Sequence, residues 1–207
     1  GLLGPNGAGK TTTISCIIGV SSPTKGNIFV LGNDVVKDYR EARACVGVSP
    51  QEFTIDTFQT VDEILDYQAG FFGITGIRMK ERREEMLKQF DLVEHRDKKF
   101  QFLSGGLKRR VTLAKAMMHN PDILILDEPT AGVDVETRRA LWKFLKELHK
   151  NGKTIILTSH YLEEIEELCE RVAIIKDGAI ITDDTVANLT QGGKLEKVYL
   201  EAVGHID

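Results

Sequence analysis

A glycine-rich segment near the start of the chain constrains the fold more than any other feature. Residues 4–11 match the pattern G-x-x-x-x-G-K-S/T, in which glycines let backbone N–H groups surround a phosphate. Such a loop follows a β-strand and opens an α-helix, whose positive N-terminal dipole adds to the phosphate site. Leu2 and Leu3 would end that strand, and a helix is predicted from Thr11 to about Val20. The pattern therefore predicts an α/β protein that binds a nucleoside triphosphate.

The loop also predicts which side chains meet the phosphates. Lys10 can reach the β- and γ-phosphates, and the hydroxyl of Thr11 can ligate Mg²⁺. The residues expected at the nucleotide are those of the loop and the first helical turn, namely Gly4, Pro5, Asn6, Gly7, Ala8, Gly9, Lys10, Thr11 and Thr12.

Two adjacent carboxylates follow an apolar run in the second half of the chain. The run Ile123–Leu126 is continuous, as expected for a strand that is buried on both faces of a parallel sheet. Asp127 at its end can meet Mg²⁺, and Glu128 can polarise a water in line with the γ-phosphate. Phosphoryl transfer depends on positioning and charge stabilisation, so this pair suits a nucleoside triphosphatase.

A second glycine-rich turn precedes these carboxylates. Ser104 is a good N-cap for the helix that follows, and Gly105 and Gly106 leave the helix N-terminus open to an anion. Because residues 4–11 already cradle the phosphates, one protomer is not expected to use both surfaces on one nucleotide. The chain therefore carries two separate phosphate-contacting surfaces.

Length and composition describe a single globular unit. The chain has 207 residues, 42% of them hydrophobic and 28% charged, and its net charge of −4 gives no argument for binding nucleic acid. Three cysteines without a C-x-x-C motif indicate neither a metal site nor a disulfide framework. No apolar stretch is long enough to span a membrane. Because the chain starts at Gly1, we expect it to be a fragment whose N-terminal strands are missing.

Changes in hydrophobic periodicity predict four segments. Residues 1–55 would form the first part of the ATPase core, and 56–103 would be an inserted all-helical subdomain. Residues 104–184 would complete the core and end in a hairpin, with Asp177 and Gly178 at its turn. The last segment, 185–207, is weakly patterned and only partly assigned.

Together these motifs resemble the nucleotide-binding domain of ATP-binding cassette (ABC) ATPases, in the order of that family and over nearly the whole chain. Residues 103–106 are similar to the signature motif, and Asp127 with Glu128 to the end of the Walker B strand. Gln51 matches the Q-loop glutamine, residues 131–134 the D-loop, and His160 the switch histidine.

The resemblance implies a role for each matched residue. Glu128, His160 and Gln51 would be catalytic, and Thr11, Gln51 and Asp127 would serve the metal, with ATP and Mg²⁺ as substrate and cofactor. Ser104, Gly105, Gly106 and Asp134 would contribute to nucleotide binding across a dimer. The aromatic residue that stacks on adenine in the family would lie upstream of Gly1.

The same resemblance implies partners and a location. Residues 126–134 and 158–164 are similar to bacterial export-type ABC subunits, so we expect a subunit that drives export through ATP-dependent dimerisation. A second nucleotide-binding subunit, as a homodimer, and integral membrane subunits are the expected partners, at the cytoplasmic face of the cell membrane. No nucleic acid is expected. The alternative is a soluble, non-transport ABC ATPase of the translation-factor or DNA-associated type.

Two further segments have more than one interpretation. Lys108–Arg110 is either a nucleic-acid patch or a solvated helix face, and three charges without interleaved aromatic residues favour the solvated face. Gly70–Gly73 is either part of the core or a docking surface for a partner.

Overall fold

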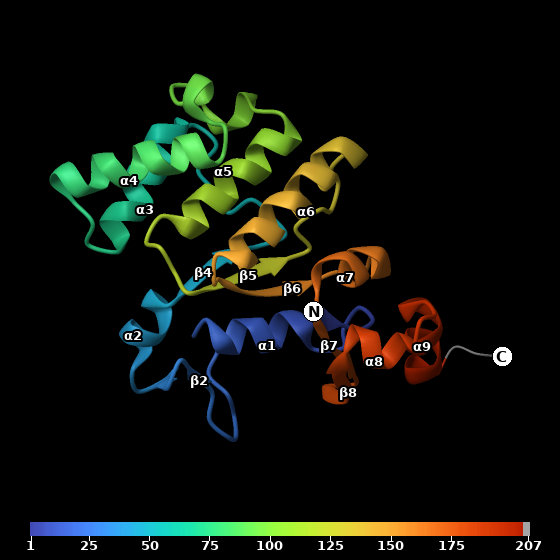
Figure 1. Ribbon diagram of the computed structural model, residues 1–207. Coiled ribbons are helices and arrows are strands. Elements are labelled where there is room, and N and C mark those ends of the chain that lie inside the picture. Colours follow the sequence, from blue (N-terminus) through green and yellow to red (C-terminus); the bar gives the residue numbers. More distant parts are fainter. Residues whose placement is uncertain (205–207) are drawn as a thin grey trace.

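A six-stranded sheet organises the computed structural model, which describes residues 1–204. Neighbouring strands are parallel except for the last pair, which is antiparallel. A separate antiparallel pair lies near the N-terminal helix (Figure 1). In spatial order the strands are β4 (Val46–Ser49), β5 (Ile123–Asp127), β6 (Thr154–Thr158), β1 (Leu2–Leu3), β7 (Arg171–Lys176) and β8 (Ala179–Thr185), and the separate pair is β2 (Phe29–Val30) with β3 (Asn33–Asp34). The predicted α/β class and mainly parallel sheet are confirmed.

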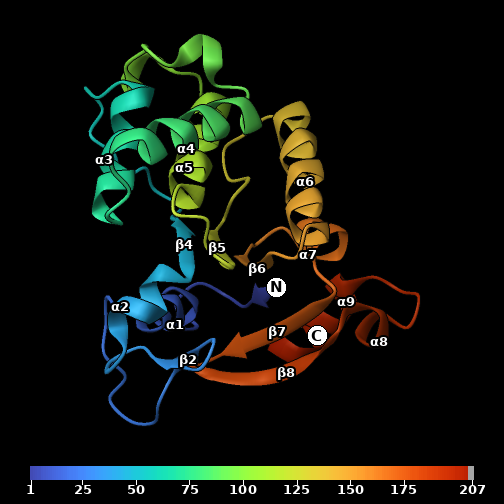
Figure 2. The same ribbon diagram turned by 60° about the vertical axis from the view of Figure 1, so that its left-hand side comes forward.

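Helices cover both faces of this sheet. Figures 1 and 2 show α3, α4 and α5 gathered above β4 and β5, with α6 next to α5, whereas α1 lies on the opposite face. None of the helices within residues 1–204 combines the length and the apolar character needed to cross a membrane. The helices are α1 (Lys10–Ile17), α2 (Tyr39–Ala44), α3 (Val61–Phe71), α4 (Gly76–Gln89), α5 (Gly105–Met117), α6 (Val135–Lys150), α7 (Leu162–Leu168), α8 (Val186–Thr190) and α9 (Leu195–Val203), with 3₁₀ turns at Val93–His95 and Phe100–Phe102.

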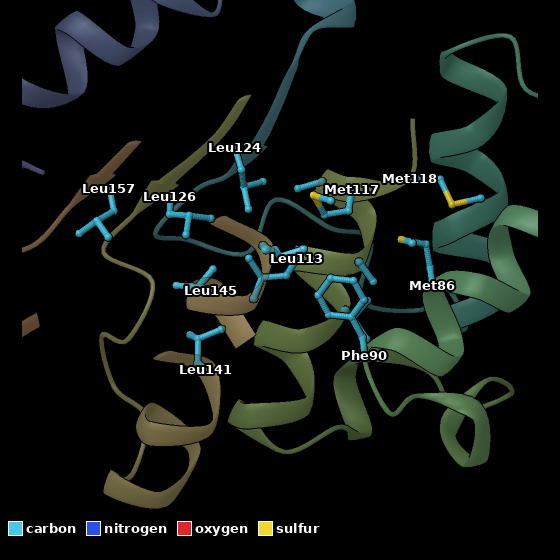
Figure 3. Close-up of a cluster of buried hydrophobic side chains, with 14 of the residues drawn as sticks. Met86, Phe90, Leu113, Met117, Met118, Leu124, Leu126, Leu141, Leu145 and Leu157 are labelled. Atoms are coloured by element: carbon cyan, nitrogen blue, oxygen red, sulfur yellow. The ribbon is translucent and has the colours of Figure 1, made fainter. Parts of the chain in front are cut away.

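Strand β5 separates two hydrophobic clusters. Side chains alternate between the faces of a strand, so Leu124 and Leu126 point to one layer and Ile125 to the other. Leu124 and Leu126 pack in a cluster with Leu113 of α5 and residues of α6 (Figure 3), whereas Ile125 packs in a cluster that includes Ile14 of α1. The continuous apolar run thus reflects burial on both faces, as predicted.

The larger cluster continues from the sheet into the helical layer. It includes Val61 of α3, Leu87 of α4, Leu113 of α5 and Leu124 of β5, all at most 1% exposed. Helix α5 therefore packs both on the sheet and on the inserted helices. The boundaries at residues 55 and 103 stay a prediction. They do not separate the hydrophobic core, because one cluster contains residues from both sides of each boundary.

Helix α3 begins at a capping box and buries one face. The hydroxyl of Thr60 accepts from the Glu63 N–H at 3.2 Å, while the Glu63 carboxylate accepts from the Thr60 N–H at 2.7 Å. This pairing satisfies two backbone donors, and such caps typically contribute about 1 kcal/mol. Val61, Ile64 and Leu65 then recur at helical spacing and are at most 2% exposed.

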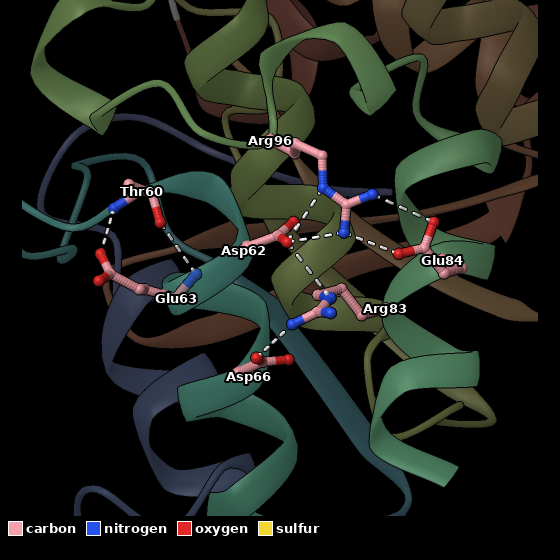
Figure 4. Close-up of polar contacts among 7 residues, drawn as sticks. All are labelled: Thr60, Asp62, Glu63, Asp66, Arg83, Glu84 and Arg96. Atoms are coloured by element: carbon pink, nitrogen blue, oxygen red, sulfur yellow. Dashed lines mark hydrogen bonds and ion pairs between the residues drawn. The ribbon is translucent and has the colours of Figure 1, made fainter. Parts of the chain in front are cut away.

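An ion-pair network joins α3, α4 and the turn after α4 (Figure 4). Arg96 donates to Asp62 and to Glu84, each at 2.7 Å, and Arg83 pairs with Asp62 and Asp66. All five side chains are half-buried, so the network is screened less than exposed pairs are. It fixes the orientation of the inserted helices relative to each other.

The segment Gly70–Gly73 was predicted to be either part of the core or a docking surface, and its two phenylalanines differ in this respect. Phe72 stacks on His119 with ring centroids 3.6 Å apart, whereas Phe71 is 77% exposed. His119 donates from Nε2 to the carbonyl oxygen of Val46 at 3.0 Å, and burial lowers its pKa to about 4. A neutral histidine thus anchors this segment to the sheet, while Phe71 faces outward.

Gly47 of β4 gives a strong test of the packing between α5 and the sheet. A Cβ at Gly47 would lie 2.3 Å from the Ala116 carbonyl oxygen and 2.8 Å from Cγ of Pro121. We expect Gly47→Ala to lower the free energy of unfolding by about 3 kcal/mol, since overpacking against backbone cannot relax cheaply. Urea unfolding followed by circular dichroism measures the change.

The matched control is Gly70→Ala in α3, where an added Cβ meets nothing within 4 Å. Because alanine favours helix, this control should be neutral or stabilise by up to about 1 kcal/mol. Equal unfolding free energies for the two variants would contradict the close approach of α5 to β4.

Candidate active site

The carboxyl ends of four parallel strands converge at one edge of the sheet, where α/β proteins bind ligands. The glycine-rich loop follows β1, Gln51 follows β4, Glu128 follows β5 and His160 follows β6. In the sheet, β6 lies between β5 and β1. Residues predicted from four distant parts of the sequence thus lie along the same edge.

The Glu128 carboxylate lies between two of these residues. Its Oε2 accepts from Nε2 of Gln51 at 2.9 Å, and its Oε1 lies 3.1 Å from Nδ1 of His160. The Glu128 side chain is 14% exposed, whereas that of His160 is 50% exposed. Contacts on both oxygens fix the direction of the carboxylate, and the exposed histidine leaves it accessible from outside.

The backbone at Glu128 is also held in an unusual conformation. Its φ of +47° lies in the left-handed region, which non-glycine residues adopt only when their surroundings impose it. The Glu128 N–H donates to the carbonyl oxygen of Thr158 at 3.1 Å and lies 3.2 Å from its hydroxyl, which also donates to the Asp127 carboxylate. Strand β6 therefore holds both carboxylate residues at the end of β5.

The glycine-rich loop is closed around its own lysine. Nζ of Lys10 donates to the carbonyl oxygens of Gly4 at 2.7 Å and Pro5 at 3.1 Å. Gly7 and Gly9 have φ values of +79° and +108°, which glycine adopts without steric cost. A Cβ at Gly7 would meet nothing within 4 Å, so the loop is exposed at this residue.

The donor atoms at this edge fit ATP with Mg²⁺. The hydroxyl of Thr11, the amide oxygen of Gln51 and the Asp127 carboxylate are hard oxygen ligands, which Mg²⁺ prefers. Within residues 1–204, no group of three or more His, Cys, Asp or Glu side chains is arranged to hold a metal by itself. Mg²⁺ commonly binds through few protein ligands together with substrate phosphates, so these residues suit a metal that arrives with its nucleotide.

The second glycine-rich turn faces outward. The hydroxyl of Ser104 accepts from the Leu107 N–H at 3.3 Å and caps α5, as predicted. Ser104 and Gly105 are exposed, and a Cβ at Gly105 would meet nothing within 4 Å. Among the described residues, no hydrogen bond links this turn to the loop at residues 4–12.

The turn contacts the start of α6. A Cβ at Gly106 would lie 3.0 Å from Cγ2 of Thr137, whose N–H and hydroxyl donate to the Asp134 carboxylate at 2.9 and 2.7 Å. Asp134 thus caps α6 and is itself exposed. Ser104, Gly105, Gly106 and Asp134 form one open surface at the ends of two adjacent helices.

One residue of the site was missed by sequence reasoning. The predicted solvated face at Lys108–Arg110 is wrong for Arg109, which is 3% exposed. Arg109 donates to backbone oxygens of Pro50, Gln51 and Glu128. The available signal was the mostly small and apolar stretch after Arg110, interrupted only by Thr112 and Lys115, which indicates a helix buried on much of its circumference.

Comparison with known proteins finds similar sequences. The sequence profile described as "ABC transporter" matches residues 1–131. The linearmycin resistance ATP-binding protein of Bacillus subtilis is 40% identical over 98% of this chain and 69% of its own length. The Nod factor export ATP-binding protein I of Burkholderia pseudomallei is 44% identical over 88% of this chain. The matched region covers 60% of the length of that relative.

Solved structures agree with these matches. The ATP-binding subunit of an ABC transporter superposes with a TM-score of 0.86 at 28% identity, covering 97% of this chain and 86% of that one. A dimeric ATP-binding cassette in a post-hydrolysis state, bound to ADP and Pi, superposes with a TM-score of 0.79 at 28% identity, covering 89% and 84%. With the motifs assembled at one edge of the sheet, these matches show that the chain belongs to the ABC transporter family, as an ATP-binding cassette.

Proposed function

We propose that this chain is the ATP-hydrolysing subunit of an ABC transporter and that Glu128 is its general base. The observation that carries the proposal is the Glu128 carboxylate, which lies between Gln51 and His160 at the sheet edge that the glycine-rich loop shares. In this position a carboxylate can accept the proton of a water that attacks the γ-phosphorus. The bond between that phosphorus and the β–γ bridging oxygen then breaks, and ADP leaves.

The other site residues bind and orient in this proposal. The loop N–H groups and Lys10 bind the phosphates, and Lys10 exchanges its contacts with Gly4 and Pro5 for phosphate oxygens. Thr11, Gln51 and Asp127 would hold Mg²⁺, which neutralises charge on the phosphates when bound. His160 lies beside Glu128 and would contact the γ-phosphate from the open side.

The outward-facing turn supports a shared site between two copies of the chain. Ser104 and Gly105 are exposed and lie at the N-terminus of a 13-residue helix, where an anion is favoured. A second copy would present its nucleotide to this turn, and Asp134 would lie in the same interface. ATP bound by both copies then stabilises the dimer by mass action, and hydrolysis removes that stabilisation.

Transport and its direction rest on the named relatives. One is named for Nod factor export and another for linearmycin resistance, which supports export by this chain. The outer side of the inserted helices exposes Tyr67, Phe71 and Ile77, each at least 63% exposed. This surface is our candidate contact for a membrane subunit, and the chain would work at the cytoplasmic face of the membrane.

Lys10 provides the direct test of nucleotide use. We expect Lys10→Ala to reduce ATP affinity and ATP hydrolysis by about tenfold or more, because a hydrogen bond to a charged phosphate is worth roughly 1.5–3 kcal/mol. Calorimetric titration with ATP and a phosphate-release assay measure the two quantities.

The matched control is Lys25→Ala in the exposed loop before β2, which should leave both quantities unchanged. Unchanged hydrolysis in Lys10→Ala would overturn the proposed ATP site. A protein that hydrolyses ATP but never enters the membrane fraction of its own cells would contradict the transport part alone.

A further inference from the structure

Arg109 is a buried cation that contacts two of the proposed catalytic segments at once. Its Nη1 donates to the Pro50 carbonyl oxygen at 2.9 Å. Its Nη2 donates to the carbonyl oxygens of Glu128 at 3.2 Å and Gln51 at 3.5 Å. The same guanidinium therefore joins the backbone before and at Gln51 to the backbone of Glu128.

The surroundings of this guanidinium keep it in place. Its central carbon lies 5.4 Å from the ring centroid of Phe53, two residues after Gln51. Burial lowers the pKa of Arg109, and the negative charges of Glu164 and Asp127 oppose that shift. An arginine remains charged under these conditions, so the protein meets its desolvation cost with backbone oxygens, an aromatic face and two nearby carboxylates.

Guanidinium geometry matters for this connection. Nη2 contacts both segments, at Gln51 and Glu128, and Nη1 adds a second contact to the first segment at Pro50. Because the guanidinium is planar and rigid, these three contacts limit the distance between the two segments. A lysine ammonium is a single point on a flexible stem, so it lacks the rigid plane that holds the carbonyl oxygens of Pro50, Gln51 and Glu128 together. Arg109 is thus suited to set a spacing, beyond supplying charge.

We propose that Arg109 is a positioning residue that sets the spacing between Gln51 and Glu128 and links it to helix α5. The proposal rests on the function proposed above, in which Gln51 and Glu128 act on one attacking water. Arg109 lies on α5, within roughly two turns of the Ser104 cap. When the Ser104 turn closes on a second copy's nucleotide, any shift of α5 moves the backbone of Gln51 and Glu128 together.

Arg109→Met tests the proposal, because methionine fills much of the buried space without hydrogen bonds or charge. We expect kcat for ATP to fall about tenfold to a hundredfold, since small misplacements of reacting groups have effects of this size. KM should change less than about threefold, because the phosphate-binding loop is untouched. Lys108→Met is the control, since Lys108 is partly exposed on the same helix and its ammonium only lies near the Phe100 ring.

Hydrogen exchange in the nucleotide-free protein gives a readout that does not depend on ATP turnover. The amides of Glu128 and Ala131 are hydrogen-bonded, to Thr158 and to the Glu128 carbonyl oxygen respectively. In Arg109→Met these two amides should exchange faster, while the amides of α3 keep their protection. Faster exchange throughout the chain would mean that Arg109 has a structural role only, which would overturn the proposal. Unchanged exchange at these two amides, or an unchanged kcat, would also overturn it.

Arg109→Lys keeps the test decisive if the methionine variant does not fold. Lysine preserves the charge but loses the fixed contact with both backbone segments. The kcat of Arg109→Lys should therefore lie between the values for wild type and Arg109→Met. If Arg109→Met does not fold, the kcat of Arg109→Lys should still lie below that of wild type. If Arg109→Lys shows the kcat and the hydrogen exchange of wild type, the planar guanidinium is not needed and the proposal fails. If wild-type protein has no ATPase activity, the function proposed above fails, and the exchange experiment still decides whether Arg109 orders the two segments.

Discussion

Replacing Glu128 by glutamine should stop ATP turnover while leaving ATP binding intact. The amide has nearly the same shape, but it cannot accept the proton of the attacking water. General-base catalysis typically contributes about 10²–10⁴-fold, so we expect kcat to fall about 10³-fold. Lys10, Thr11 and Asp127, the residues proposed to hold the phosphates and Mg²⁺, are unchanged, so ATP affinity should stay near the wild-type value.

The same variant should accumulate as a dimer in ATP. A complex that binds ATP in both copies and cannot hydrolyse it retains the stabilisation that the nucleotide supplies. Light scattering after size-exclusion chromatography in ATP measures the dimer, and phosphate release measures turnover.

Glu163→Gln is the control for Glu128→Gln, because Glu163 is exposed on α7 three residues after His160. It should hydrolyse ATP at the wild-type rate. Normal turnover in Glu128→Gln would show that another group accepts the proton. Lost turnover without an ATP-dependent dimer would leave the base assignment standing and contradict the shared-site dimer.

Ser104→Arg should abolish ATP-dependent dimerisation without removing ATP from the glycine-rich loop. The substitution places a long, charged side chain on the exposed turn where a second copy's nucleotide would bind. Within one copy, no hydrogen bond among the described residues joins this turn to the loop at residues 4–12, so ATP affinity should change less than about threefold. Turnover should be lost together with the dimer.

Loss of the helix cap must be separated from loss of the interface. Removing a capping side chain costs about 1 kcal/mol, and Ser104→Arg removes one. Thr185→Arg removes an equivalent cap, because the Thr185 hydroxyl accepts from the Asn188 N–H at 3.2 Å at the start of α8. This control should dimerise normally in ATP. If Ser104→Arg loses ATP binding itself, the turn belongs to the nucleotide site of its own copy.

Local signals were sufficient to predict most of the architecture. Glycines at residues 4–9, the apolar run at β5 and the turn at Asp177 each depend on a few neighbouring residues, and each element was found where it was expected. Gln51 and His160 were assigned to the site only through the family resemblance, and the structure brings both next to Glu128 at the edge where the carboxyl ends of the parallel strands meet. Their separate distances and hydrogen bonds depended on side-chain packing and could not be read from spacing.

Features that depend on tertiary contacts were missed. Arg109 reads as a surface charge because its neighbours Lys108 and Arg110 are charged, and its burial is decided by residues 50–53 and 128, which are distant in sequence. Helices α8 and α9 were not assigned, because each is short and weakly patterned on its own. Leu195 at the start of α9 is fully buried, so packing against the rest of the chain stabilises that helix. Residues 205–207 of the predicted C-terminal segment lie outside the described part.

The sheet, with hydrophobic layers on its two faces, has a consequence for how such a chain can diversify. The layer beneath Ile125 supports the helix that follows the nucleotide loop, and the layer above Leu124 and Leu126 supports the helices that display Tyr67 and Phe71. A residue in one layer has few neighbours in the other layer. The effects on stability of one substitution in each layer should therefore be nearly additive. Under the proposed function, substitutions in the outer helices can therefore change the candidate contact with a membrane subunit while the layer that supports the nucleotide loop keeps its stability.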